Sequence, residues 1–211
     1  DPSGNSVVLT GDVAVVAINM NNAESISCTF RNIMAPEQPT ACEPGDTWTP
    51  KEDFGGGNRA NAVGFSIGTK GYVGTGTYSP DLWEYDADPT SATYDTWTQK
   101  ADLEGVARNQ ATSFSIGTKG YVGTGESDGG NLQDLWEFDS TSEVNGFDVN
   151  NNPMGDWTQK ADFLGGDRQA ATGFSIESKG YVGTGMSIGG TQNDFWEYDP
   201  TSEVNGFDVN N

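Results

Sequence analysis

A sequence unit that occurs three times constrains the fold of this chain more than any other feature. The clearest copy runs from Trp157 to Asp199, and the earlier copies begin at Trp48 and Trp97. The copies stay in register, because a repeated arginine and a repeated tyrosine both step by 49 and then 60 residues. These residues are Arg59, Arg108 and Arg168, and Tyr72, Tyr121 and Tyr181. A period of this size accommodates four short strands, the content of one β-propeller blade.

Each unit contains four segments in which aromatic and β-branched residues alternate with small ones, with Gly, Asn, Asp or Ser clusters between them. The first expected strand is 61–67, with copies that start at 110 and 170. The second is 70–76, with copies that start at 119 and 179, and the third is 81–86, with copies that start at 134 and 194. The fourth is the Trp-Thr-Gln-Lys segment Trp97–Lys100, with copies at Trp48–Lys51 and Trp157–Lys160. Because no useful stretch follows a helical period, the pattern predicts an all-β fold.

The order of these segments resembles the kelch repeat. In the first copy a hairpin turn precedes Gly-Tyr-Val-Gly-Thr-Gly, and a variable loop, Asp-Leu-Trp-Glu-Tyr-Asp and a lone tryptophan strand follow. Kelch repeats usually carry two glycines after the second strand, and here Gly74-Thr75-Gly76 stands in their place, as in a divergent bacterial, galactose-oxidase-like variant. The resemblance covers residues 48–211 as repeats 48–96, 97–156 and 157–211. It implies antiparallel β-propeller blades around a central channel.

Cationic residues occupy fixed places in the repeat. Nine of the ten Lys and Arg residues fall at three repeat positions, which favours an architectural role over ligand binding. We expect each repeated arginine to pair with a carboxylate, and the candidates are Glu84, Glu137 and Glu197. The six tryptophans fall two per repeat and are expected to pack the blades. They are Trp48, Trp97, Trp157, Trp83, Trp136 and Trp196.

Composition argues against several classes of function. The net charge of −21 makes nucleic acid an unlikely partner, because phosphate binding needs clustered Lys and Arg. The chain has no histidine, so it has no Ser-His-Asp or Cys-His system and no imidazole metal ligand. No apolar run has the length that membrane insertion requires. The sequence therefore predicts no catalytic residues, and we expect a protein that is not an enzyme.

The first 47 residues do not belong to the repeat. Residues 1–33 predict three strands, and Ala23–Asn32 resembles the end of the prealbumin-like or immunoglobulin-like modules of large bacterial surface proteins. Residues 34–47 predict a linker, because they contain three prolines and no periodicity. A disulfide between Cys28 and Cys42 would close a loop of about 15 residues and stabilise the chain by roughly 3 kcal/mol. The alternative is that one cysteine pairs with a residue outside this chain.

An Asn/Asp-rich insertion at 139–156 is the best candidate for metal chemistry. Calcium binds six to eight oxygens from such loops, although the order of an EF-hand is absent here. The other interpretation is a turn whose side chains cap its own backbone. The insertion recurs in part near the end of the chain. The candidate calcium ligands are Glu143, Asn145, Asp148, Asn150 and Asp156, and Glu203, Asn205, Asp208 and Asn210.

The repeat, the charge and the two resemblances together predict a secreted or cell-surface bacterial protein. We expect a non-catalytic binding or adhesion module that takes a protein or glycan ligand on the loop face of a kelch propeller. The alternative is a structural subunit of an extracellular assembly whose open blade edges are completed by neighbouring chains. Part of a secreted glycan-active enzyme is a third interpretation. Because three blades do not close a ring, we expect a longer propeller protein, and the alternatives are a six-bladed ring of two copies or an open assembly.

Overall fold

The computed structural model describes residues 7–10, 13–16 and 47–202. The chain divides into two units, Asp1–Thr49 and Pro50–Asn211. In the first unit, β1 (Val7–Thr10) and β2 (Val13–Val16) form an antiparallel hairpin. The third strand predicted in this region, most of the predicted linker, Cys28 and Cys42 lie outside the described residues.

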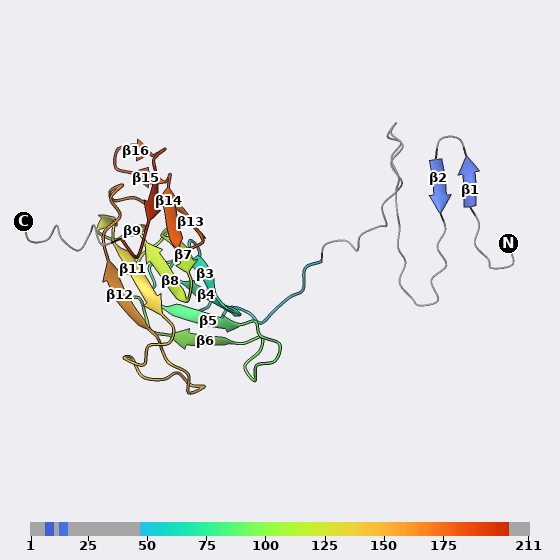
Figure 1. Ribbon diagram of the computed structural model, residues 1–211, viewed down its shortest axis with the longest axis horizontal. Helices are drawn as coiled ribbons and strands as arrows, with labels where there is room; N and C mark the ends of the chain where they lie inside the picture. The colour runs from blue at the N-terminus through green and yellow to red at the C-terminus, as the bar shows by residue number, and fades with distance from the viewer. Residues whose placement is uncertain (1–6, 11–12, 17–46, 203–211) are drawn as a thin grey trace, which may run out of the picture. The chain divides into compact units, whose positions relative to one another are not determined.

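The second unit consists of antiparallel sheets, and the described part of the chain has no helix, so the predicted all-β class is confirmed (Figure 1). Sheet I contains β3 (Val63–Ile67), β4 (Lys70–Gly74), β5 (Leu82–Asp86) and β6 (Trp97–Lys100). Sheet II contains β7 (Thr112–Ile116), β8 (Lys119–Gly123), β11 (Leu135–Asp139) and β12 (Asp156–Lys160). Sheet III contains β13 (Thr172–Ile176), β14 (Lys179–Gly183) and β17 (Phe195–Tyr198).

Two short hairpins extend from the loops between the second and third strands of sheets II and III. They are β9 (Glu126–Ser127) with β10 (Gly130–Asn131), and β15 (Met186–Ser187) with β16 (Gly190–Thr191). Within residues 7–10, 13–16 and 47–202, no helix has the length and apolar character to cross a membrane.

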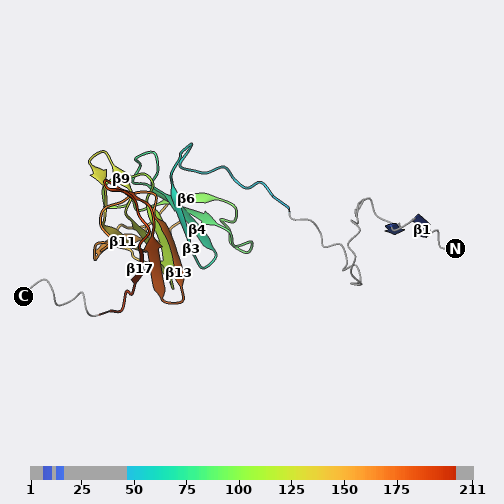
Figure 2. The same ribbon diagram turned by 90° about the horizontal axis from the view of Figure 1, so that it is seen from above.

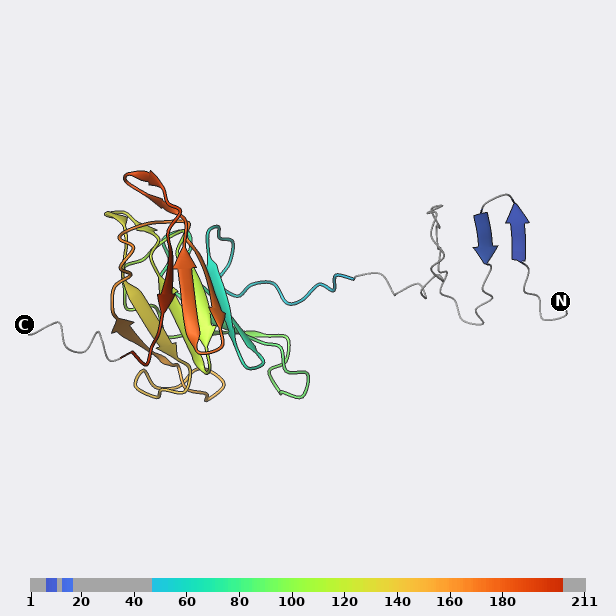
Figure 3. The same cartoon turned by 45° about the horizontal axis from the view of Figure 1, so that its top comes forward.

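The three sheets pack one against the next in sequence order. Their first strands β3, β7 and β13 are neighbours, as Figure 2 and Figure 3 show. Alternation along these strands explains the packing, because every second residue points towards the adjoining sheet. In β7, Phe114 and Ile116 are buried against sheet III. The same register in β3 places Phe65 against sheet II.

Glycines in the second strands make this close approach of sheets possible. A Cβ atom on Gly120 would lie closer than 3.0 Å to three ring carbons of Phe65 on the preceding sheet. A Cβ atom on Gly180 would lie within 3.0 Å of three ring carbons of Phe114. Gly71 in sheet I is the exception, because the nearest atom to its added Cβ is the Cβ of Tyr85 at 3.9 Å. Sheets I and II therefore each offer a phenylalanine ring to a glycine of the next sheet.

Replacing Gly120 with alanine is expected to lower the free energy of unfolding by about 1–3 kcal/mol, as overpacking of a core does. The Phe65 ring has little room to move, because it is buried and stacks on Tyr72 at a centroid distance of 5.1 Å. Urea denaturation measures the effect, with Gly129→Ala as the control, because an added Cβ at Gly129 would meet only Ser127 Oγ, at 3.6 Å. A Gly120→Ala protein as stable as the control would contradict this account of the packing.

Two apolar cores lie between consecutive sheets. The first joins sheets I and II and includes Trp157, Phe138 and Leu82. The second joins sheets II and III and includes Phe114, Tyr121, Leu135 and Val182. The outer face of sheet III repeats the apolar residues of the others but has no sheet packed on it within the described part of the chain. Its exposed residues are Phe174 (42% exposed), Ile176 (56%) and Phe195 (56%).

Candidate functional site

In each sheet, an arginine that precedes the first strand binds an aspartate that precedes the third strand. The fully buried Arg108 donates to the two carboxylate oxygens of Asp134 at 2.6 and 2.7 Å. The same two-bond geometry joins Arg59 to Asp81 and Arg168 to Asp194. The prediction that each repeated arginine pairs with a carboxylate is therefore confirmed.

The predicted partners of these arginines, Glu84, Glu137 and Glu197, were wrong. The arginine precedes the first strand of its sheet, so it reaches the aspartate that comes just before the third strand. The glutamates lie inside the third strand, opposite the tyrosine of the second strand. They accept hydrogen bonds from Tyr72, Tyr121 and Tyr181 at 2.6, 2.6 and 2.8 Å, respectively. A sequence signal for the true partner was present, because an aspartate precedes the third strand in every copy.

The aspartate also anchors the tryptophan of the third strand. The indole Nε1 of Trp83, Trp136 and Trp196 donates to it at 2.7, 2.7 and 2.8 Å. Hydrogen bonds from Arg168 and then Trp196 lower the pKa of Asp194 to about 2. Trp83 and Trp136 are half-buried at this position, whereas Trp196 is 38% exposed, so the predicted packing role does not hold equally for all three.

The Gly-Thr-Gly segments serve the same arginines. Thr124 has a positive φ of 56°, and this turns its carbonyl towards Arg108, which donates to it at 3.1 Å. The following Gly125 also has a positive φ, and its N–H donates to the carbonyl of Arg168 in the next sheet at 2.7 Å. Gly76 makes the equivalent bond to the Arg108 carbonyl at 2.9 Å. These turns therefore bind each sheet to its successor.

The insertion predicted as a calcium loop packs against β6 of the preceding sheet. Asp148 accepts from the buried Lys100 ammonium at 2.6 Å and from the backbone of Asn150 and Asn152. Burial would raise the pKa of Asp148, but these hydrogen bonds together lower it. The Asn145 amide donates to Gly155 and Asp156.

The structure therefore uses several of the predicted ligand groups in contacts within the protein. Asn150 likewise donates to Thr98 at 3.0 Å. Glu203, Asn205, Asp208 and Asn210 lie outside the described residues. Calcium binding by this insertion stays a prediction.

The tryptophan of the fourth strand closes the core between two sheets. Trp157 in β12 is 4% exposed, lies 5.0 Å from Phe138 between ring centroids, and donates from Nε1 to the carbonyl of Ala101 at 3.0 Å. Trp97 in β6 donates in the same way to the carbonyl of Glu52 at 3.2 Å. Each fourth-strand tryptophan thus reaches back to the segment that leads into its own sheet.

A cavity of about 350 Å³ lies where this rule would place one more tryptophan. It opens between sheets II and III, and its lining includes Phe114, Leu135, Ala161, Val182 and Tyr198. Ala161 is the repeat equivalent of Ala101, so its carbonyl corresponds to the acceptor of the Trp157 indole. The first core contains a tryptophan at this point, and the second core has the cavity.

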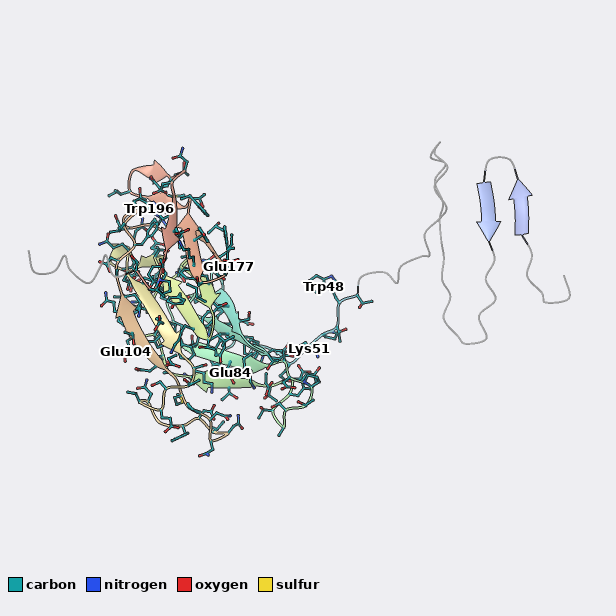
Figure 4. The ribbon with its side chains drawn as sticks, viewed as in Figure 1. Trp48, Lys51, Glu84, Glu104, Glu177 and Trp196 are labelled. Carbon is teal, nitrogen blue, oxygen red and sulfur yellow. The ribbon has the colours of Figure 1, made fainter. Side chains whose placement is uncertain are left out.

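The free edge of β17 borders the same cavity. In sheet II the third strand pairs with a fourth, with Phe138 opposite Trp157 and Leu135 opposite Lys160. In sheet III no strand of the described chain pairs with the outer edge of β17. Trp196, which Figure 4 marks on this sheet, is 38% exposed. The sequence predicted open blade edges but not this cavity, because a cavity between sheets has no signal in sequence spacing.

No protein-family model matches the chain, and a search of curated proteins found no match. Among solved structures, one titled "Structure of YjhT" is similar, with 22% sequence identity and a TM-score of 0.49. The similarity covers 65% of this chain and 36% of that chain. The chain thus spans little more than a third of the length of that structure.

Proposed function

We propose that this chain is a non-catalytic protein-binding module built from kelch-type propeller blades, and that its third blade binds an extended segment of another polypeptide as a fourth strand. The observation that carries the proposal is the cavity beside the free edge of β17. It occupies the position that Trp157 fills between sheets I and II. The high negative charge and the tight turns suit the extracellular or cell-surface setting that we propose for it.

The register of the complete sheets defines the chemistry of the ligand. Addition of a strand to a sheet edge gains affinity from main-chain hydrogen bonds and specificity from side-chain pockets. By analogy with β12, the ligand tryptophan lies opposite Tyr198 and its indole Nε1 donates to the Ala161 carbonyl. A ligand lysine three residues later lies opposite Phe195. The site therefore favours a Trp-x-x-Lys segment.

A glutamate on the accepting strand adds to this specificity. Lys160 lies 3.4 Å from Glu137 in sheet II, and Lys100 lies 3.7 Å from Glu84 in sheet I. Glu197 holds the equivalent place in sheet III. A lysine on the incoming strand would gain the same neighbour, which supports a cationic residue at that position of the ligand.

A labelled peptide with the sequence of residues 153–163 tests the proposal. We expect it to bind the full chain with a roughly micromolar dissociation constant, because the preformed cavity and strand edge need little reorganisation. Fluorescence anisotropy with dilute protein measures the binding. The control is the same peptide with alanine in place of tryptophan, which should bind at least about tenfold more weakly. Equal binding of both peptides, or no binding of either, would contradict the proposal.

The loop face offers a second place for a protein ligand. The hairpin of β15 and β16 carries Ile188, which is 100% exposed, next to Met186 at 46%. Exposed apolar side chains on a hairpin favour contact with another protein over contact with a glycan. This observation supports an adhesion role of the loops beside the strand-binding role of β17.

A further inference from the structure

We propose that the segment which completes sheet III is Trp48–Lys51 of a second copy of this chain. The inference rests on the proposed function, because it names the occupant of the same site. Trp48-Thr-Pro-Lys51 is the first of the three fourth-strand copies. The indole of Trp48 is 99% exposed, so it is available for burial in a partner.

Trp48–Lys51 precedes sheet I in the sequence by the same interval that separates each fourth strand from the first strand of the next sheet. Lys100 and Lys160 each precede the first strand of the following sheet by 12 residues, and Lys51 precedes Val63 by the same interval. The residue after each lysine also makes the same contact, because the Glu52 carbonyl accepts from Trp97 as the Ala101 carbonyl accepts from Trp157. Trp48–Lys51 therefore corresponds to the last strand of a sheet that precedes sheet I.

Pro50 is compatible with this role. It replaces the glutamine found at the same position in β6 and β12. Proline is tolerated in edge strands, where a missing N–H can face solvent, and the fourth strand is the outermost strand of sheets I and II.

The outer faces of the first and last sheets are complementary. Phe174 of sheet III is 42% exposed, although its equivalents Phe65 and Phe114 are each buried against a glycine of the next sheet. Gly71 of sheet I is the glycine that has no ring against it among the described residues. A second copy whose sheet I follows sheet III would bring Phe174 against Gly71.

The backbone has the same complementarity. The N–H of Gly76 and of Gly125 each donates to an arginine carbonyl of the next sheet. In the described structure, the N–H of the equivalent Gly185 donates to no protein group, and the Arg59 carbonyl accepts from none. Joining sheet III of one copy to sheet I of another pairs these groups.

Three features of the repeat thus fit one arrangement of two copies. The contact is head-to-tail, and such contacts form a closed ring or an open chain according to the rotation between copies. Two copies contribute six sheets in all, a number within the four to eight blades of propellers. Either arrangement covers the apolar face of sheet III.

Sedimentation equilibrium of the full chain tests the inference. We expect a dimer or a longer assembly whose dissociation constant rises at least about tenfold in Trp48→Ala and in Gly71→Ala, because both substitutions act at the centre of the contact. Gly129→Ala is the matched control, because its added Cβ would meet only Ser127 Oγ at 3.6 Å. It should leave the association unchanged. Circular dichroism should show that all three variants keep the fold.

The outcomes separate this inference from the proposed function. The inference that a second copy completes sheet III fails if the chain stays monomeric at high concentration. It also fails if neither Trp48→Ala nor Gly71→Ala weakens the association. If such a chain still binds the tryptophan peptide, the site accepts another protein and the proposed function stands. If the Trp48→Ala protein binds no peptide, the proposed function fails as well.

Discussion

Replacement of Arg108 with methionine is expected to lower the free energy of unfolding by about 3–5 kcal/mol, the usual cost of breaking a buried ion pair. The side chain of Arg108 is fully buried, and it donates to Asp134, to the Thr124 carbonyl and to the Val106 carbonyl. Methionine can fill much of the volume but removes the guanidinium donor from all three acceptors, and Asp134 keeps only the hydrogen bond from Trp136. The Asp134 carboxylate then loses both hydrogen bonds from the guanidinium in a partly buried site.

Chemical denaturation in urea measures this loss, and Lys119→Met is the matched control. Lys119 pairs with Asp139 in the same sheet, but its side chain is 32% exposed. Exposed ion pairs contribute about 0–1 kcal/mol, so the control should be nearly as stable as the parent chain. Equal stability of the two variants would contradict an architectural role for the repeated arginine.

Replacement of Trp157 with alanine is expected to lower the free energy of unfolding by about 3–5 kcal/mol, as removal of a buried aromatic side chain does. The loss has two parts. The indole ring leaves a space in the core beside Phe138, and the Ala101 carbonyl loses its donor. The variant would give sheets I and II the cavity that sheets II and III already have.

An exposed residue provides the comparison for Trp157. Leu164 is 75% exposed, so Leu164→Ala should change the free energy of unfolding by less than about 0.5 kcal/mol. Differential scanning calorimetry of the two variants at equal protein concentration measures the contrast. Equal melting temperatures of the Trp157→Ala and Leu164→Ala proteins would show that the fourth strand does not seal the core.

Repetition made most of the fold predictable from the sequence. The period-2 pattern located the strands of the three sheets, and three copies in register fixed their order, because a single short strand would have been ambiguous. The predicted strand Trp48–Lys51 was wrong, because this segment forms no strand in the structure. The structure places β3, β4 and β5 within the predicted repeat 48–96, but β6 (Trp97–Lys100), the fourth strand of the same sheet, lies at the start of the next predicted repeat. The all-β class therefore followed from local chemistry that recurs.

The predictions failed where a contact depends on geometry across strands. Glu84 was a reasonable partner for Arg59 by charge, but it lies opposite Tyr72, whose hydroxyl donates to it. Burial, and then the Glu84 carboxylate, raise the pKa of Tyr72 well above its usual range. The recurrence of Asp81 in every copy was a signal for the true partner, but Glu84 recurs in every copy as well. The cavity could not be predicted either, because the sequence shows which residues are apolar but not whether they fill the space between two sheets.

The reach of Trp157 into the core of sheets I and II has a consequence for synthesis on the ribosome. Chains emerge from the N-terminus, and domains begin to fold before synthesis ends. All four strands of sheet I have been made when Lys100 emerges, yet its core stays unsealed until Trp157 follows. The nascent chain thus exposes the apolar face of sheet I, with Val63 and Phe65, until sheet II has been made.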